Sequence, residues 1–333
     1  MKTGTLTEIA SQRIGVENNP VRVWMASWHH RGNLFATCGD DKAIRLWTFN
    51  PDSDEKLENR TVLDDSHTRT VRCVNFSHCG RFLASASFDS TIVIYENDNG
   101  DYTEVNKLEG HESEVKWCAF SPSDEFFATC SRDKSVWFWQ MDEDDDFNVS
   151  SILQPHTQDV KFVAWHPSEE LLVSCSYDSS IRFFKYDGED WITQQKIENI
   201  HEGTVWSAAF DANGHKLVTV GEDRTIQVFA RSDPTKSALT NTWTSVAKLT
   251  IQSRWPLYSV SWNQNTGLIA TAGGDSKIRI FRLENDSNIE ELGSFKIHEQ
   301  EVNCVAWCPS EAHSDVIVST SDDGFVKVSS FRL

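Results

Sequence analysis

The chain has 333 residues, of which 39% are hydrophobic and 24% are charged, a composition typical of a globular protein with a large core. Acidic residues outnumber basic ones by 50 to 31, so the formal net charge is −19, and such a surface repels a nucleic-acid backbone. No apolar run approaches the roughly 18 residues that cross a bilayer, and the segment Met1–Leu6 lacks the apolar stretch of a secretory signal. We therefore expect no direct nucleic-acid binding, no membrane association and no secretion.

Seven segments along the chain share one pattern. Each begins with a small apolar strand, turns at an aspartate and continues as an alternating strand, and all but the last end on a large aromatic residue. In chain order the segments are residues 34–47, 82–95, 126–139, 171–184, 216–229, 268–281 and 316–329. Their turn aspartates, spaced 44 to 52 residues apart, are Asp41, Asp89, Asp133, Asp178, Asp223, Asp275 and Asp323. Alternation with period 2, bounded by turns, predicts β-strands throughout.

Three further positions recur around these segments. A hydroxyl residue precedes each turn aspartate by four positions: Thr37, Ser85, Thr129, Ser174, Thr219, Thr271 and Ser319. Upstream of each segment another strand ends in an aromatic residue: Trp28, Phe76, Phe120, Trp165, Phe210, Trp262 and Trp307. A histidine precedes five of these aromatics by nine residues: His67, His111, His156, His201 and His298. A repeat of this length with four strands per unit predicts a β-propeller, so we expect a single all-β domain of seven blades over residues 1–333.

A propeller must also close its ring. The chain ends at Leu333, just past the third strand of the seventh blade, so we expect Leu6–Ile14 to supply the missing outer strand and protect the open edge. Three polar stretches are expected to be solvated outer loops: Asp142–Asp146, Ala230–Lys248 and Glu284–Glu291.

The repeated residues resemble those of the WD-repeat propellers, whose blades carry His, Ser or Thr, Asp and Trp in one hydrogen-bonded series. Only the third blade keeps all four, as the tetrad His111, Thr129, Asp133 and Trp139. Where the series is incomplete we expect a less stable blade. The departures are Asn19 and Ser253 in place of the histidine in the first and sixth blades, and Ser329 in place of the aromatic in the last.

The same His, Ser/Thr and Asp sets superficially resemble hydrolytic triads. An active site is needed once, whereas a structural brace is needed in every blade, so the recurrence favours a structural role. No Walker loop, GxSxG, HExxH or GxGxxG motif occurs. We therefore predict that the chain is not an enzyme.

Two positions per blade are expected near the rim of the channel: the residue five past the histidine position, and the residue before each turn aspartate. Together they include nine basic or aromatic side chains, the rim set: Trp24, Arg72, Phe88, Lys116, Arg132, Lys161, Tyr177, Trp206 and Tyr258. A basic, aromatic patch on an acidic protein suggests a site for an acidic, aromatic-bearing peptide or a carboxylate terminus. The alternative is that these side chains only pair with neighbouring Asp and Glu.

The eight cysteines include no CxxC pair and no spacing typical of a zinc or iron–sulfur site: Cys38, Cys73, Cys79, Cys118, Cys130, Cys175, Cys304 and Cys308. Without a secretory signal a disulfide framework is not expected, and we predict reduced core thiols of a cytosolic or nuclear protein. We predict no cofactor and no bound metal.

Most of the chain, above all residues 108–178 with the run CSRDKSVW, is similar to the WD-repeat family of cytosolic iron–sulfur cluster assembly. The resemblance implies a non-catalytic adaptor in the complex that delivers clusters to cytosolic and nuclear apoproteins, located in the cytoplasm and also in the nucleus. It implies four kinds of protein partner: a DUF59-type assembly protein, a HEAT-repeat adaptor, an iron-only hydrogenase-like protein and the client apoproteins. It also implies that Arg132 matches a functional surface arginine.

One departure concerns the Leu-Tyr-Arg tripeptide by which some members bind a co-chaperone. Here the corresponding residues are Phe183, Phe184 and Lys185, so that partner is not expected.

Two other functions stay open at this stage. A generic WD-repeat scaffold, such as a ubiquitin-ligase substrate receptor or a chromatin subunit, would predict a dedicated helical extension. A hydrolytic propeller would need a metal or a carboxylate set at the channel mouth.

Overall fold

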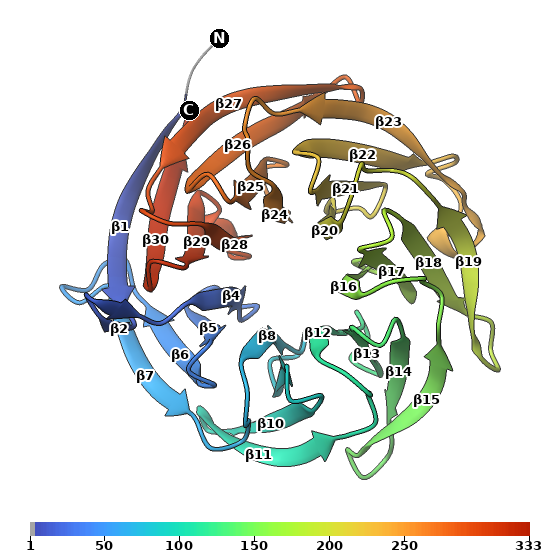
Figure 1. Cartoon of the computed structure of the whole chain (residues 1–333), viewed down its shortest axis with the longest axis horizontal. Helices are drawn as coiled ribbons and strands as arrows, with labels where there is room; N and C mark the ends of the chain where they lie inside the picture. The colour runs from blue at the N-terminus through green and yellow to red at the C-terminus, as the bar shows by residue number, and fades with distance from the viewer. Residues whose placement is uncertain (1–3) are drawn as a thin grey trace.

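A computed structural model describes residues 4–333, and in it seven four-stranded antiparallel sheets form a ring around a central channel (Figure 1). Each sheet is one blade, and its strands are ordered from the channel outward (Figure 1). The predicted all-β propeller of seven blades is thereby confirmed. The first three residues of the segment Met1–Leu6 lie outside the described residues.

The four strands of each blade follow one another in the sequence, except in the last blade. The innermost strands of blades 1 to 7 are β4 (Val23–Trp28), β8 (Val71–Phe76), β12 (Val115–Phe120), β16 (Val160–Trp165), β20 (Val205–Phe210), β24 (Leu257–Trp262) and β28 (Val302–Trp307). The second strands are β5 (Leu34–Gly39), β9 (Phe82–Ser87), β13 (Phe126–Ser131), β17 (Leu171–Ser176), β21 (Lys216–Gly221), β25 (Ile269–Gly273) and β29 (Val316–Ser321). The third strands are β6 (Ile44–Phe49), β10 (Ile92–Asp98), β14 (Val136–Met141), β18 (Ile181–Tyr186), β22 (Thr225–Arg231), β26 (Lys277–Glu284) and β30 (Phe325–Arg332). The outer strands are β7 (Leu57–Leu63), β11 (Asp101–Leu108), β15 (Phe147–Leu153), β19 (Trp191–Ile197), β23 (Trp243–Thr250), β27 (Asn288–Lys296) and, for blade 7, β1 (Thr5–Arg13).

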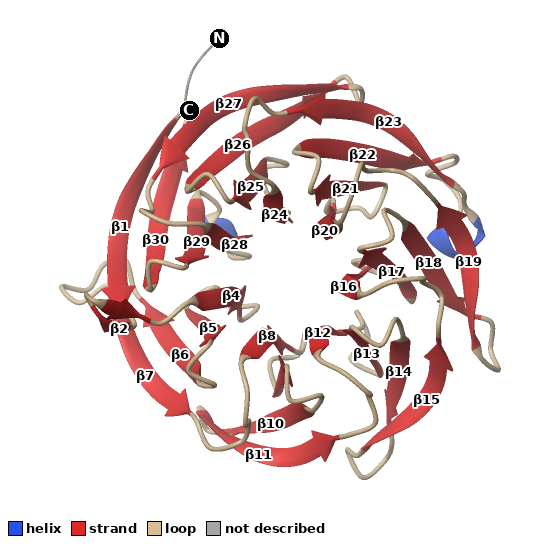
Figure 2. Ribbon diagram, in the orientation of Figure 1, coloured by secondary structure: helices blue, strands red, loops and turns tan. Residues whose placement is uncertain are grey.

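The remaining elements are short. A small hairpin, β2 (Gly15–Val16) with β3 (Asn19–Pro20), precedes blade 1. Two 3₁₀ turns, η1 (Ala238–Thr240) and η2 (Glu311–His313), are the blue segments of Figure 2. None of the helices in residues 4–333 has the length and apolarity that crossing a membrane requires.

The ring closes where the two ends of the chain meet. Strand β1 pairs with β30 in antiparallel register, with Leu6 opposite Phe331, and the two lie side by side in Figure 1, dark blue beside red. Phe331 is buried with Leu6 packed against its cluster. The N-terminal strand therefore completes blade 7, as the sequence predicts, and leaves no unpaired outer edge on β30.

The core lies between neighbouring blades rather than inside any one of them. Between blades 3 and 4, Phe138 stacks on Trp191 with ring centroids 4.1 Å apart, and Trp165 packs edge-on against Trp191 at 5.3 Å. Alternating side chains of each strand face the two neighbouring blades, which is why the inner three strands are apolar on both faces.

Each turn aspartate lies in a tight turn between the second and third strands of its blade, and in all blades but the sixth it accepts a backbone N–H of that turn. In blade 3, Asp133 accepts the backbone N–H of Ser135 at 2.9 Å. The residue after the aspartate has a positive φ between 63° and 80° in every blade: Lys42, Ser90, Lys134, Ser179, Arg224, Ser276 and Gly324. Such side-chain-to-backbone bonds favour turns, and this explains the aspartate at one fixed position per repeat.

Two of the predicted outer loops need correction. Glu284 ends β26, and residues 288–291 belong to β27, so only the residues between these strands form a loop. Within residues 230–248, Ala238 and Trp243 are almost fully buried because the segment packs on blade 4. Gln194 of β19 donates to the carbonyl oxygen of Asn241 at 2.7 Å. Asp142–Asp146 is a turn between β14 and β15, as predicted.

Candidate functional site

The predicted tetrad of blade 3 forms a continuous hydrogen-bonded series. Nδ1 of His111 lies 2.8 Å from Oδ2 of Asp133, and its Nε2 lies 2.8 Å from Oγ1 of Thr129. Trp139 donates from Nε1 to the same Thr129 oxygen at 3.0 Å. The imidazole is fully buried, so the series joins the loop that enters the blade to its turn and satisfies polar groups that would otherwise be stranded.

The histidine brace recurs in four other blades. Its Nδ1-to-carboxylate distances are 3.1 Å for His67 and Asp89, 2.9 Å for His156 and Asp178, 2.8 Å for His201 and Asp223, and 3.0 Å for His298 and Asp323. Five equivalent copies that are buried within the blades are braces rather than one reaction centre.

The brace shifts the ionisation of its aspartate. Burial alone would raise the pKa of Asp133, but the hydrogen bonds from His111 and Ser135 outweigh it and hold this pKa well below its usual range. At Asp323 burial again opposes the change, but the hydrogen bonds from His298 and from the backbone N–H groups of Glu299 and Phe325 lower the pKa to about 2. These carboxylates are therefore ionised anchors near neutral pH.

In blades 1 and 6, which lack the histidine, an arginine contacts the turn aspartate instead, a contact that the repeat pattern did not predict. Arg45 contacts Asp41 at 2.6 Å, and Arg279 contacts Asp275 at 3.1 Å. Each arginine follows its aspartate by four residues on the third strand. In blade 6 the missing histidine lowers stability, because Oγ1 of Thr271 is buried without a hydrogen-bond partner in the described structure.

The rim set lies at one mouth of the channel, where the two predicted positions of each blade meet. Nζ of Lys116 sits 4.1 Å from the ring centroid of Phe88. Nζ of Lys161 sits between two rings, 5.4 Å from that of Tyr177 and 5.5 Å from that of Trp206. Cation–π attraction between each ammonium group and the neighbouring ring favours these side-chain positions.

The contacts continue on both sides of these lysines. The Arg72 guanidinium lies 4.9 Å from the Trp24 ring and 5.8 Å from the Trp117 ring. On the other side, the rings of Trp206 and Tyr258 meet edge to face at 5.4 Å. Contacts of the rim set therefore run from blade 1 to blade 3 and again from blade 4 to blade 6.

Some residues of the rim set pair with neighbouring acidic side chains, as the alternative interpretation of the sequence expects. Arg132, whose side chain is 58% exposed, contacts Glu114 at 3.2 Å, and Lys161 contacts Asp159 at 3.0 Å. In residues 4–333, by contrast, no carboxylate lies within ion-pair distance of Arg72.

The rim carries charge of both signs, because the residues before the turn aspartates of blades 1, 5 and 7 are themselves acidic. Blades 2 to 4 contribute most of the cations, of which Arg132 and Lys161 are paired with Glu114 and Asp159 of the same blades. Blades 1, 5 and 7 contribute Asp40, which accepts from Trp24 at 2.6 Å, Glu222, which accepts from Trp206 at 2.9 Å, and Asp322, which pairs with Arg22 at 2.9 Å. Blades 2 to 4 therefore form a mainly basic sector of the channel mouth. Blades 5, 7 and 1 form a mainly acidic sector, in which Arg22 is a paired cation.

Two ionisations at the rim are shifted. Burial, together with the nearby cations Lys161 and Arg72, lowers the pKa of Lys116 to about 8. At Glu114, burial opposes the change, but the hydrogen bonds from Arg132 and Ser113 lower the pKa to about 2. The Lys116 ammonium therefore loses its proton closer to neutral pH than an ordinary lysine does.

Two rim residues were missed because they lie in loops outside the two repeated positions. Arg69 sits 5.9 Å from the Phe88 ring and pairs with Glu114 at 3.3 Å. Trp255 is 53% exposed and precedes blade 6, beside Gly274. The signal in the sequence was a tryptophan two residues after Ser253, in the entry loop that lacks the histidine.

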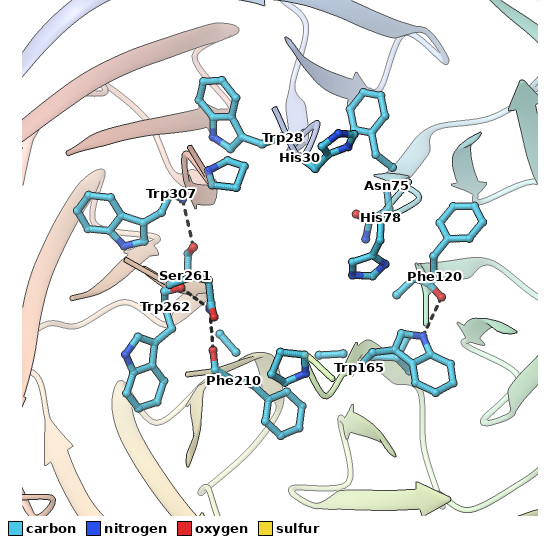
Figure 3. Close-up of a pocket in the computed structure, with 18 of the residues that line it drawn as sticks. Trp28, His30, Asn75, His78, Phe120, Trp165, Phe210, Ser261, Trp262 and Trp307 are labelled. Atoms are coloured by element: carbon cyan, nitrogen blue, oxygen red, sulfur yellow. Dashed lines mark hydrogen bonds between the residues drawn. The ribbon is translucent and has the colours of Figure 1, made fainter. Parts of the chain in front are cut away.

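The opposite part of the channel holds a cavity of about 550 Å³. Figure 3 shows that the aromatic side chains around it, Trp28, Trp165, Trp262 and Trp307 among them, point away from the hollow and into the blades. Its wall includes Asn75, Ser261, His30 and His78. Within residues 4–333, no cluster of three His, Cys, Asp or Glu side chains has the arrangement to hold a metal ion.

Comparison with known proteins gives the family. The model of the WD domain, G-beta repeat, matches seven times, at residues 15–48, 59–96, 102–140, 147–185, 193–229, 243–282 and 289–328. A Caenorhabditis elegans protein named probable cytosolic iron-sulfur protein assembly protein CIAO1 homolog is 60% identical over 94% of this chain and 95% of its own length. The chain belongs to this family of WD-repeat assembly proteins.

Further members of the assembly family align over almost the whole chain. A probable cytosolic iron-sulfur protein assembly protein of Culex quinquefasciatus is 42% identical over 93% of this chain and 95% of its own length. One from Vanderwaltozyma polyspora is 35% identical over 89% of this chain and 92% of its own length.

The residues that correspond to the tripeptide lie on β18 of blade 4. Phe183 and Phe184 are fully buried, and Nζ of Lys185 donates to the carbonyl oxygen of Leu239 at 3.1 Å. The two phenylalanines are therefore core residues of blade 4, and the lysine fixes the neighbouring segment around Leu239.

The cysteine prediction needs one correction. Seven of the thiols are buried, but Cys79 is exposed because it lies in the turn between β8 and β9. Burial raises the pKa of Cys175 and Cys304, so these thiols stay protonated.

Proposed function

We propose that this chain is a non-catalytic adaptor of cytosolic iron–sulfur protein assembly, which helps a targeting complex deliver clusters to apoproteins through protein–protein contacts. The observation that carries the proposal is the 60% identity, over nearly the full length, to a relative named for this assembly. The cluster is cargo in this scheme. We propose no cofactor or metal of the chain's own and no enzymatic activity, since its His–Asp pairs are used as buried braces.

The rim set is the proposed docking surface. Arg132 is largely exposed at the basic sector, where Lys116 and Arg72 lie over aromatic rings. Guanidinium and ammonium groups beside aromatic faces suit an acidic segment with an aromatic residue or a free carboxylate. The mainly acidic sector would orient such a segment by repelling it from blades 5, 7 and 1.

The proposed partners are a DUF59-type assembly protein, a HEAT-repeat adaptor, an iron-only hydrogenase-like protein and client apoproteins, in the cytoplasm and also in the nucleus. No direct contact with nucleic acid or membrane is proposed, in keeping with the net charge of −19.

Affinity capture from cytosol tests the proposal, with the wild-type chain, an Arg132→Glu variant and an Arg60→Glu control. Arg60 is an exposed arginine of the outer strand β7. We expect the wild type and the control to recover iron–sulfur assembly factors and cluster-dependent enzymes, and Arg132→Glu to lose part of that set. Recovery of ubiquitin-ligase or chromatin subunits instead would remove the proposed function.

A further inference from the structure

The outer edges of the blades differ in how well they are protected. An edge strand exposes unpaired N–H and C=O groups, and charged side chains are the usual protection against pairing with another chain. Six of the seven outer strands of residues 4–333 carry at least one charged residue, such as Lys196 in β19 and Lys248 in β23. Strand β15, with the sequence FNVSSIL, carries none.

Strand β15 also presents apolar side chains at its edge. Val149 is 47% exposed and Ile152 is 50% exposed. A register shift between them places Val149 opposite Trp139 and Ile152 opposite Trp137, so both lie on one face of the blade. The other outer strands have a register shift at the equivalent place, so this irregularity is common to all blades. The feature that distinguishes β15 is its lack of charged residues.

An acidic loop adjoins the beginning of this strand. The turn Asp142–Asp146 leads directly into β15 and is held on blade 2 by Arg81, which contacts Asp145 at 2.6 Å. Asn106 of β11 donates to Asp146 at 3.1 Å. Glu143 and Asp144 remain exposed, so fixed negative charge stands at one end of an uncharged edge.

We propose that the outer edge of β15 receives an extended segment of a partner protein, which pairs with it as a fifth strand of blade 3. Backbone hydrogen bonds would provide much of the affinity, and alternate apolar side chains would cover Val149 and Ile152. All strand pairs in the blade are antiparallel, so the added strand runs antiparallel to β15. Its C-terminal end then lies beside Glu143 and Asp144, and lysine or arginine there completes the charge match.

A second copy of this chain fits the edge less well. In an antiparallel β15 pair, each acidic loop would face the residues that follow Leu153 in the other copy, which are Gln154 and Pro155. Neither carries a positive charge.

The proposal concerns a surface apart from the rim, so it stands or falls independently of the proposed function.

Binding of short synthetic peptides to the full chain tests the proposal by fluorescence anisotropy. The probe alternates threonine and valine and ends in two lysines. We expect it to bind more tightly than the same peptide with the lysines at its N-terminus, and much more tightly than one ending in two glutamates. Ile152→Lys and the double variant Glu143→Lys, Asp144→Lys should each weaken binding at least about tenfold, the loss expected for about 1.4 kcal/mol.

The matched control is Val62→Lys, an exposed valine at the equivalent position of β7. Thermal melting of each variant checks that it folds, and hydrogen exchange should show added protection confined to residues 147–153. Equal binding by Ile152→Lys and Val62→Lys, or no binding to the wild type, would overturn the proposal. A dimer in sedimentation that Ile152→Lys abolishes would also overturn it, in favour of a second copy.

Discussion

At the scale of single residues, five blades hold a buried imidazole between a hydroxyl and a turn carboxylate. The carboxylate has a lowered pKa, as at Asp133, because its hydrogen bonds to His111 and Ser135 favour the charged form. A depressed pKa contributes stability above the pKa of the unfolded chain, about 4, and this contribution is lost as the pH falls toward the folded-state value. Acid should therefore loosen the braces.

The variant Asp133→Asn tests this at one blade. At neutral pH it should cost about 2 kcal/mol, since the partners of the carboxylate stay buried without their charged acceptor. The difference from wild type should shrink as the pH falls below about 4, because the unfolded wild-type chain then takes up a proton at Asp133 that the folded chain does not. Urea unfolding across this range measures it, with Asp144→Asn in the exposed loop as control. A difference that stays constant from neutral pH to pH 3 would contradict the account.

At the scale of elements, the joint between β1 and β30 makes the ring a closed structure. Phe331 packs against the cluster that includes Ile317 and Leu292 and is 4% exposed. Phe331→Ala should lower the free energy of unfolding by about 3 kcal/mol through the cavity it leaves. Arg332→Ala, next to it but exposed, should change stability by less than about 0.5 kcal/mol. Equal effects of the two in chemical unfolding would show that the joint is not part of the cooperative core.

The blades, the tetrad of blade 3 and the closure by the N-terminal strand could be predicted because a repeat makes seven positions equivalent. Elements without an equivalent in the repeat could not. The segment around Ala238 reads as polar in sequence, yet Glu169 of blade 4 accepts its backbone N–H at 2.8 Å and fixes it in place. Cys79 reads as a core thiol, yet its turn leaves it exposed. Such outcomes depend on tertiary contacts that no local pattern records.

At the scale of the whole molecule, the candidate site combines predictable and unpredictable parts. That Arg72, Lys116 and Lys161 share one channel mouth follows from the repeat alone. Their pairing with rings and acids depends on side-chain directions, and the exposed Trp255 lies in a loop of unrepeated length. The result is a closed ring whose channel mouth has a mainly basic and a mainly acidic sector, a geometry suited to orienting other proteins.

The most direct measurement is the cluster content of client enzymes in cells depleted of this protein. Radiolabelled iron would be counted in an immunoprecipitated cytosolic iron–sulfur enzyme and in a mitochondrial one. The account predicts a several-fold loss in the cytosolic enzyme alone, restored by the wild-type chain and by Arg60→Glu but not by Arg132→Glu. An unchanged cytosolic enzyme, or an equal loss in both, would contradict it.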